Sequence, residues 1–114
     1  MIVRTWRGAV RPADEERYLR HQADTGVGEY RETPGNLGAL VLRRERDGLV
    51  EVTTVSFWES MDAVRAFAGD DPERAKFYPG DDDLLAQKDA HADHYELIGV
   101  DLDPALVQRP DASG

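Results

Sequence analysis

The sequence contains no cysteine. This absence excludes disulfide bonds, thiolate nucleophiles, iron–sulfur clusters and zinc sites built from cysteine. Basic residues are also scarce, because 14 lysines and arginines stand against 23 aspartates and glutamates, which gives a formal charge of −9. Such a surface repels phosphate backbones and anionic lipids, so we expect neither nucleic acid nor a membrane surface as a partner.

Long apolar runs and several catalytic motifs are absent as well. No stretch approaches the run of about 18 apolar residues that spans a membrane, and the first eight residues, MIVRTWRG, lack the apolar segment of a signal peptide. We therefore expect a cytoplasmic protein. A G-x-S-x-G nucleophile motif is missing, and Gly26-x-Gly28 lacks the third glycine and the preceding strand of a dinucleotide site. A serine nucleophile and a nicotinamide or flavin site are not expected.

The 114 residues suit a single domain, which we expect over residues 1–103, with a polar tail over 104–114. Residues 2–10 are rich in β-branched and aromatic side chains and predict a strand that ends before Pro12. Pro12 and the acidic residues after it favour the start of a helix. That helix is expected to reach the glycines at 26 and 28, with a short turn after them.

The middle of the chain predicts a hairpin and a second helix. Two β-rich runs, 37–46 and 49–58, flank Asp47-Gly48, a pair that is typical of a tight hairpin turn. Ser60 can cap a helix whose apolar stripe includes Val64 and Phe67. The acidic triplet at 81–83 is expected in a loop, and a last strand is expected over about 93–102.

The element order is therefore strand, helix, strand, strand, helix, strand, which predicts a ferredoxin-like α+β domain with both helices on one face of the sheet. Residues 37–42 are apolar without alternation, and the strand that follows carries apolar side chains on both faces. Strands that are apolar on both faces need cover on both. Because the helices cover one face, we expect the other to pack against a second copy, so that a homodimer forms an α/β barrel.

Several motifs resemble those of the antibiotic biosynthesis monooxygenase family. They are Phe57-Trp58-Glu59-Ser60 with Ala63 and Phe67 after it, the turn Thr33-Pro34-Gly35-Asn36, and the closing His94-Tyr95-Glu96. The resemblance covers about residues 2–100 and implies the dimeric α/β-barrel fold. It also implies an activity among those of the family, which includes cofactor-independent oxygenases of aromatic polyketides and haem-degrading oxygenases.

The two branches are matched unequally. Trp58 stands where the polyketide-oxidising branch has a pocket tryptophan. Of the four other functional positions of that branch, two carry Thr54 and Val64, and the other two fall near Arg44 and Tyr78. The haem-degrading branch has an asparagine, a tryptophan and an iron-binding histidine at positions that carry Trp6, Phe67 and the 76–77 region here. The resemblance therefore implies no haem, and we expect no cofactor.

Three histidines are candidates for proton transfer, because histidine titrates near neutral pH without perturbation. If the ring of His94 points between sheet and helices, it can take a proton from a phenolic or enolic substrate, and we expect it to be the catalytic residue. His21 is a candidate for substrate binding and otherwise a solvated helix residue, and His91 is expected in a polar loop. A metal site at His91 and His94 with nearby aspartates is less favoured than a solvated acidic loop, so no metal is expected.

Aromatic and basic residues supply the rest of the expected site. Trp6, Phe67 and Tyr78, with Trp58, can stack on a flat aromatic substrate, although core packing also explains such residues. Arg4 alternates with Arg7 on the first strand and either faces the rim or points inward. A buried guanidinium needs an anionic partner, which is a carboxylate or a substrate oxyanion.

These observations favour a pocket enzyme that oxidises an aromatic or polyketide-type molecule with O₂ and no cofactor. Deprotonation of a phenol gives an electron-rich anion that can react with O₂ directly. Two alternatives stay open: an isomerase or cyclase on the same fold, whose activity would survive without oxygen, and a non-catalytic protein that binds a small molecule.

Overall fold

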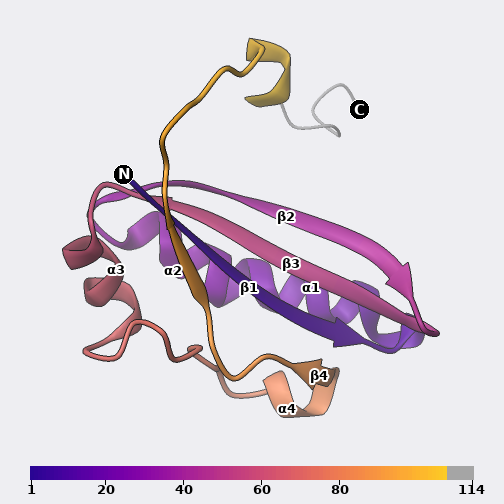
Figure 1. The fold of residues 1–114 in the computed structure, drawn as a ribbon. Helices are drawn as coiled ribbons and strands as arrows, with labels where there is room; N and C mark the ends of the chain where they lie inside the picture. Colours follow the sequence, from indigo (N-terminus) through magenta and orange to yellow (C-terminus); the bar gives the residue numbers. More distant parts are fainter. Residues whose placement is uncertain (108–114) are drawn as a thin grey trace.

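A computed structural model describes residues 1–107 of the chain. Within these residues, five strands form one sheet, and the long helical segment lies along one of its faces (Figure 1). In chain order the elements are β1 (Ile2–Val10), a 3₁₀ turn (Pro12–Asp14), α1 (Glu15–Asp24), α2 (Gly26–Glu32), β2 (Asn36–Arg46), β3 (Leu49–Trp58), α3 (Met61–Ala68), α4 (Asp81–Leu84), β4 (Leu85–Lys88), β5 (Asp93–Glu96) and a second 3₁₀ turn (Pro104–Val107).

The sheet has the strand order β2-β3-β1-β4, and β5 also pairs with β1. Every pairing is antiparallel. β5 occupies the first half of the free edge of β1, at residues 2–5, and β4 occupies the second half, at residues 8–10. The last strand position of a ferredoxin-like sheet is thus filled by two short strands, and the expected α+β fold is confirmed.

The turn of the β2–β3 hairpin and the start of α3 lie where local chemistry predicts. Asp47 and Gly48 both have positive φ angles, 54° and 78°, as a two-residue turn between twisted strands requires. The Ser60 side chain accepts a hydrogen bond from the backbone N–H of Ala63 and caps α3. Val64, on the predicted stripe of α3, is fully buried.

Three expectations about local structure were wrong. The last strand was expected over 93–102 but ends at Glu96, because β1 begins at Ile2 and the N–H of Leu97 already bonds to the carbonyl of Met1. The strand β4 was not expected at all. Residues 81–84 form a short helix rather than a loop, because the Asp81 side chain accepts from the N–H of Tyr78 and closes the preceding turn.

Two apolar clusters fill the space between the sheet and the helices, one of them around Val10 and Tyr18 and the other around Tyr30 and Trp58. Within residues 1–107, no helix has both the length and the apolar character to cross a membrane. The expected tail falls into two parts: residues 104–107 form the second 3₁₀ turn, whereas residues 108–114 lie outside the described part of the chain.

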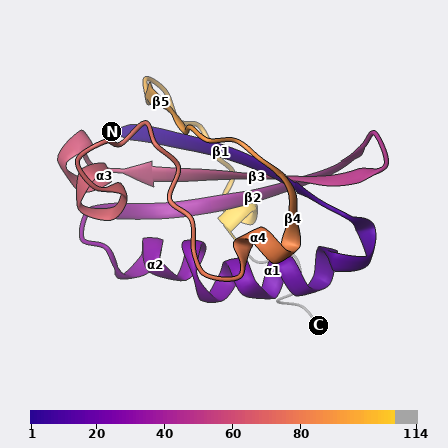
Figure 2. The ribbon, with the colours of Figure 1, turned by 90° about the horizontal axis from the view of Figure 1, so that it is seen from below.

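The opposite face of the sheet also carries apolar side chains, as the sequence predicted. The register places Leu40 opposite Val55, and Val3 opposite Phe57, all on the face away from α1 and α2. Figure 2 shows α1 and α2 below the sheet and α3 at one end of it. Leu40 and Leu42 are exposed, at 42% and 50% of their surface. This outer face therefore presents apolar surface to solvent in the single chain.

Candidate functional site

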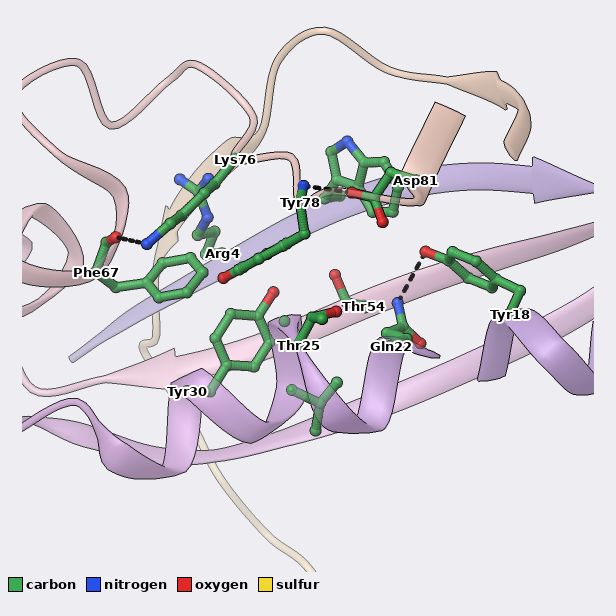
Figure 3. Close-up of a pocket in the computed structure, with 13 residues that line it drawn as sticks. Arg4, Tyr18, Gln22, Thr25, Tyr30, Thr54, Phe67, Lys76, Tyr78 and Asp81 are labelled. Carbon is green, nitrogen blue, oxygen red and sulfur yellow. Dashed lines mark hydrogen bonds between the residues drawn. The ribbon is translucent and has the colours of Figure 1, made fainter. Parts of the chain in front are cut away.

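A small cavity lies between the helix-facing side of the sheet, the helices α1 and α2, and the irregular segment 69–80 that crosses from α3 to α4 (Figure 3). It leaves about 40 Å³ of space, which is enough for a few water molecules. It is lined by Arg4, Trp6, Tyr18, Gln22, Thr25, Gly26, Val27, Tyr30, Thr54, Phe67, Lys76, Tyr78 and Asp81.

Arg4 is the charged residue at the base of this cavity. The register of β1 with β3 places it opposite Ser56 on the helix-facing side, and it is only 3% exposed. Nη1 donates to the carbonyl of Pro72, and Nη2 donates to the carbonyl of Arg74 at 3.3 Å. Among residues 1–107, no carboxylate forms an ion pair with this guanidinium, and burial lowers the pKa of Arg4. The inward orientation that the sequence left open is the one observed.

His94 contacts Arg4. The two residues are paired in the β1–β5 register, and Nε2 of His94 lies 3.0 Å from Nη1 of Arg4. A guanidinium can only donate, so Nε2 must be the acceptor and the proton sits on Nδ1. Burial lowers the pKa of His94, and the positive charge of Arg4 lowers it further. The ring does not line the cavity, whereas Arg4, which it contacts, does.

Lys76 and Tyr78 cover the cavity from the segment 69–80, and both are held by Glu29 of α2. Lys76 Nζ lies 2.6 Å from a carboxylate oxygen of Glu29, and the Tyr78 hydroxyl donates to the other oxygen. Burial raises the pKa of Glu29, but these two donors outweigh burial and leave it below its usual value. The pKa of Tyr78 is raised by burial and by the nearby carboxylate, so this phenol keeps its proton at neutral pH.

Tyr30 supplies a second phenol from the opposite wall. Its hydroxyl and that of Tyr78 point toward one another beside the Phe67 ring (Figure 3). Burial raises the pKa of Tyr30, and a hydrogen bond with Thr54 and the charge of Arg4 offset part of that rise. The Tyr30 ring packs edge-on against Phe67, with 4.8 Å between ring centres.

His21 reaches the site through Asp81. Its Nε2 lies 2.7 Å from Oδ1 of Asp81, whose second oxygen accepts from the backbone N–H of Tyr78. His21 itself does not line the cavity. The pair therefore fixes the turn that carries Tyr78 against helix α1.

The structure brings together four of the predicted substrate-binding residues, because Arg4, Trp6, Phe67 and Tyr78 all line the cavity. Trp58 does not: it is fully buried behind Phe67, with 5.5 Å between the rings, and its Nε1 donates to the Ser56 hydroxyl.

His91 is exposed. Within residues 1–107, no group of three or more histidine, aspartate or glutamate side chains is placed to hold a metal ion. The cavity also includes residues that sequence reasoning missed. Tyr18, Gln22, Gly26 and Tyr30 recur at intervals of four and line it from one side. This spacing is helical and continues across Gly26 and Gly28, where the first helix was expected to end. It is the signal in the sequence that indicates these four lining residues.

Comparisons with known proteins agree with this architecture. The family model described as antibiotic biosynthesis monooxygenase matches residues 1–75. No curated protein matches the sequence. A Bacillus cereus protein described as a candidate antibiotic biosynthesis monooxygenase has a similar structure, with a TM-score of 0.61, 18% identity, and coverage of 90% of this chain and 97% of that one.

Two further solved structures are similar and show bound molecules. A Streptomyces coelicolor monooxygenase in complex with nanaomycin D has a TM-score of 0.60 and 22% identity, over 90% of this chain and 91% of that one. A Mycobacterium tuberculosis haem-degrader with two haems in its active site has a TM-score of 0.55 and 19% identity, over 90% and 100% of the two chains. At these identities the structural likeness shows the fold alone. Because the family model covers well over half of the sequence, the chain belongs to the antibiotic biosynthesis monooxygenase family.

Proposed function

We propose that this protein binds a small aromatic or polyketide-type molecule in the cavity and oxidises it with O₂, without a bound cofactor. The observation that carries the proposal is the lining: Trp6, Tyr30, Phe67 and Tyr78 enclose one space in a protein of this family. Aromatic walls with a few polar groups suit a flat ring that carries hydroxyl or carbonyl oxygens. The nanaomycin D bound to the similar Streptomyces coelicolor monooxygenase supports this substrate class.

The cavity must enlarge before such a ligand can bind. About 40 Å³ admits water but not an aromatic ring. Lys76 and Tyr78 are the covering residues, and they belong to a segment without regular helix or strand structure. We propose that the ligand displaces these two side chains from Glu29 and takes their place against Phe67.

The proposed reaction balances without an external reductant. A phenol or enol loses its proton, and the resulting anion transfers an electron to O₂. Recombination forms a carbon–oxygen bond at the activated CH₂ carbon, and the hydroperoxide loses water to leave a ketone. One oxygen atom enters the product and the other leaves as water, while the substrate carbon supplies all the electrons.

We propose His94 as the proton acceptor of this reaction. Its Nε2 is already unprotonated, but it is occupied by Arg4, and His94 does not line the cavity. When Arg4 turns toward a substrate oxyanion, Nε2 becomes free to receive a proton. General base catalysis of this kind contributes roughly 10²–10⁴-fold to a rate.

Oxygen uptake with anthrones and hydroquinones tests the proposal. We expect the protein to consume one O₂ per anthrone, at a rate well above that of a Trp6→Ala plus His94→Ala variant. Arg20→Ala, which changes an exposed residue of α1, is the matched control and should retain the full rate. Uptake no faster than that of the double variant would remove the proposal.

A haem-dependent reaction is not supported by the residues of this cavity. None of the residues that line it is a histidine, and His21 and His94 both have Nε2 engaged by neighbouring side chains. The cavity therefore offers no imidazole for the iron. A Soret band on addition of haem that disappears in His94→Ala would contradict this reading.

A binding protein without turnover is the second candidate. It is favoured by one observation: the acceptor nitrogen of His94 is occupied by Arg4, so His94 presents no free base to the cavity in this structure. Stoichiometric binding of an anthrone, with neither O₂ uptake nor product under air, would support this candidate over the oxygenase. Product formed in the absence of oxygen would instead indicate an isomerase or cyclase.

We also propose that two chains associate through the outer face of the sheet. Leu40 and Leu42 expose apolar surface there. Residues 97–107 run away from the sheet (Figure 1) and expose further apolar side chains, among them Ile98 at 94%. Burying this surface would remove its contact with water. Sedimentation velocity at micromolar concentration should show a dimer that Leu42→Glu converts to a monomer, and a monomeric wild-type protein would contradict the proposal.

A further inference from the structure

We infer that Arg4 forms an anion-binding subsite, and that the aromatic ligand of the cavity therefore carries a carboxylate or an ionised phenol or enol. This inference rests on the proposed function, because it takes the cavity as the place where an aromatic molecule binds. Two details are new: the negative charge of that molecule, and Arg4 as the residue that selects it.

The hydrogen-bond donors of Arg4 are only partly used. The protein supplies three acceptors: the carbonyls of Pro72 and Arg74, and Nε2 of His94. A guanidinium carries five N–H groups, so Nε–H and one Nη2–H have no partner among the described residues. Arg4 lines the cavity, and an oxygen placed there can accept from this fork.

All of the acceptors that the protein offers to Arg4 are electrically neutral. A buried cation is costly unless a negative charge or a dense set of acceptors compensates it. The Phe67 ring has its centre 5.8 Å from the guanidinium carbon and adds modest attraction. Within residues 1–107 the structure therefore contains a buried positive charge that lacks its counterion, and a ligand oxyanion is the group that would complete it.

Lys76, the other cation that lines the cavity, does not lack a counterion. Lys76 is paired with Glu29 at 2.6 Å, so its charge is already neutralised. The chain as a whole carries a formal charge of −9 and repels anions at long range. A preference for an anionic ligand must consequently arise from a local source, and Arg4 is the residue positioned to provide it.

A purely structural role for Arg4 is the competing account. Its bonds to Pro72 and Arg74 attach the segment 69–80 to β1 and would stabilise the fold without any ligand. Stability alone cannot distinguish the two accounts. A comparison of a charged and a neutral ligand of the same shape can distinguish them. An arginine with only a structural role would not produce a preference for the charged ligand.

Calorimetric titration with 2-naphthoate and 2-naphthamide, under nitrogen at low salt and pH 7.5, provides that comparison. The two probes share one ring system and differ in a carboxylate against an amide. We expect the wild-type protein to bind 2-naphthoate at least ten times more tightly, since a hydrogen-bonded ion contributes more than a neutral hydrogen bond. In Arg4→Met this ratio should fall to about one, with the affinity for the amide retained within about threefold.

Two further variants keep the test decisive. Arg4→Gln removes the charge but keeps a neutral hydrogen-bond donor on the side chain, so it gives the same comparison if Arg4→Met does not fold. Arg20→Met removes an exposed cation of α1 that does not line the cavity, and it should retain the preference for naphthoate. Equal wild-type affinities, failure of both probes to bind, or a preference that survives in the neutral Arg4 variants would each overturn the inference.

The outcome is separable from that of the proposed oxygenation. The titration needs neither O₂ nor turnover, so an anion preference can be present in a protein that oxidises nothing. Conversely, oxygen uptake from anthrone together with equal affinities for naphthoate and naphthamide would refute the subsite and leave the oxygenase proposal standing.

Discussion

Replacing Glu29 with glutamine should open the cavity. The carboxylate of Glu29 holds both covering residues, Lys76 and Tyr78, and the substitution removes its charge while leaving a side chain of the same shape. These residues cover a cavity with a volume of about 40 Å³. Ligand binding in the wild-type protein should therefore be limited by the fraction of molecules in which the covering segment has moved away.

The size of the effect follows from the exposure of these groups. The side chains of Glu29 and Lys76 are 34% and 32% exposed, so their ion pair is screened and contributes about 0.5–1 kcal/mol. Tyr78 exchanges a charged acceptor for a neutral one, which costs about another 1 kcal/mol. A total of about 1.5 kcal/mol corresponds to a roughly tenfold rise in the open population, and apparent affinity rises by the same factor while opening remains rare.

Stopped-flow measurement of tryptophan fluorescence with 2-naphthamide should detect this change, because Trp6 lines the cavity. The neutral probe is chosen so that the freed charge of Lys76 does not attract it. We expect faster association and tighter apparent binding in Glu29→Gln, by about tenfold. Glu16→Gln, which alters an exposed carboxylate of α1, is the control and should behave as the wild type. Unchanged or slower association in Glu29→Gln would refute the covering role of this cluster.

Three further predictions concern stability and pH. Gly35→Ala should lower the free energy of unfolding, measured in urea, by about 2–4 kcal/mol. The reason is that φ at Gly35 is +89° and an added Cβ would lie 2.5 Å from the Cβ of Ala63. A loss below about 0.5 kcal/mol would show that the turn tolerates a side chain. Ser60→Ala should cost about 0.5–2 kcal/mol through the lost cap of α3, with Ser60→Gly costing less, and the opposite ranking of the two variants would contradict the capping role. The pKa of His94 is lowered in the folded state, so below about pH 6.5 the unfolded chain binds more protons and stability should fall as the pH drops. His94→Gln should reduce this fall in thermal melts between pH 7.5 and 5.5, and an identical pH profile would contradict the contact of His94 with Arg4.

The features that the sequence could predict are those decided by neighbouring residues. Asp47-Gly48 specifies a two-residue turn by its own backbone preferences, and Ser60 caps a helix that begins one residue later. Period-two alternation also placed apolar side chains on both faces of β3. These local signals were sufficient to predict the ferredoxin-like order of elements.

The features that could not be predicted depend on a partner distant in the chain. The end of β5 at Glu96 follows from where β1 begins, and β4 exists because β1 has a second stretch of free edge. Alternation showed that Arg4 and Arg7 face opposite sides, but only the position of the helices shows which side is buried. For the same reason the sequence singles out Trp58 but does not indicate that Phe67, which packs against it, lines the cavity while Trp58 does not.

His94 illustrates the difference most clearly. Its residue type and its position on the last strand favoured a base that faces the substrate. The register instead pairs it with Arg4, so the ring first serves as an acceptor for the guanidinium. A proton acceptor and a positioning residue have the same sequence signature, and the distance of 3.0 Å to Nη1 is what separates the two roles in the closed state.

The location of a bound aromatic ring tests the account most directly. Nuclear magnetic resonance of the protein with 2-naphthoate should show intermolecular contacts between the naphthyl protons and the rings of Phe67 and Tyr30, together with a shift of the Trp6 indole N–H signal. The resonances of Leu40 and Leu42 on the outer face should stay in place. Contacts confined to the outer face, with the Phe67 and Tyr30 signals unmoved, would contradict the claim that the space between sheet and helices is the binding site.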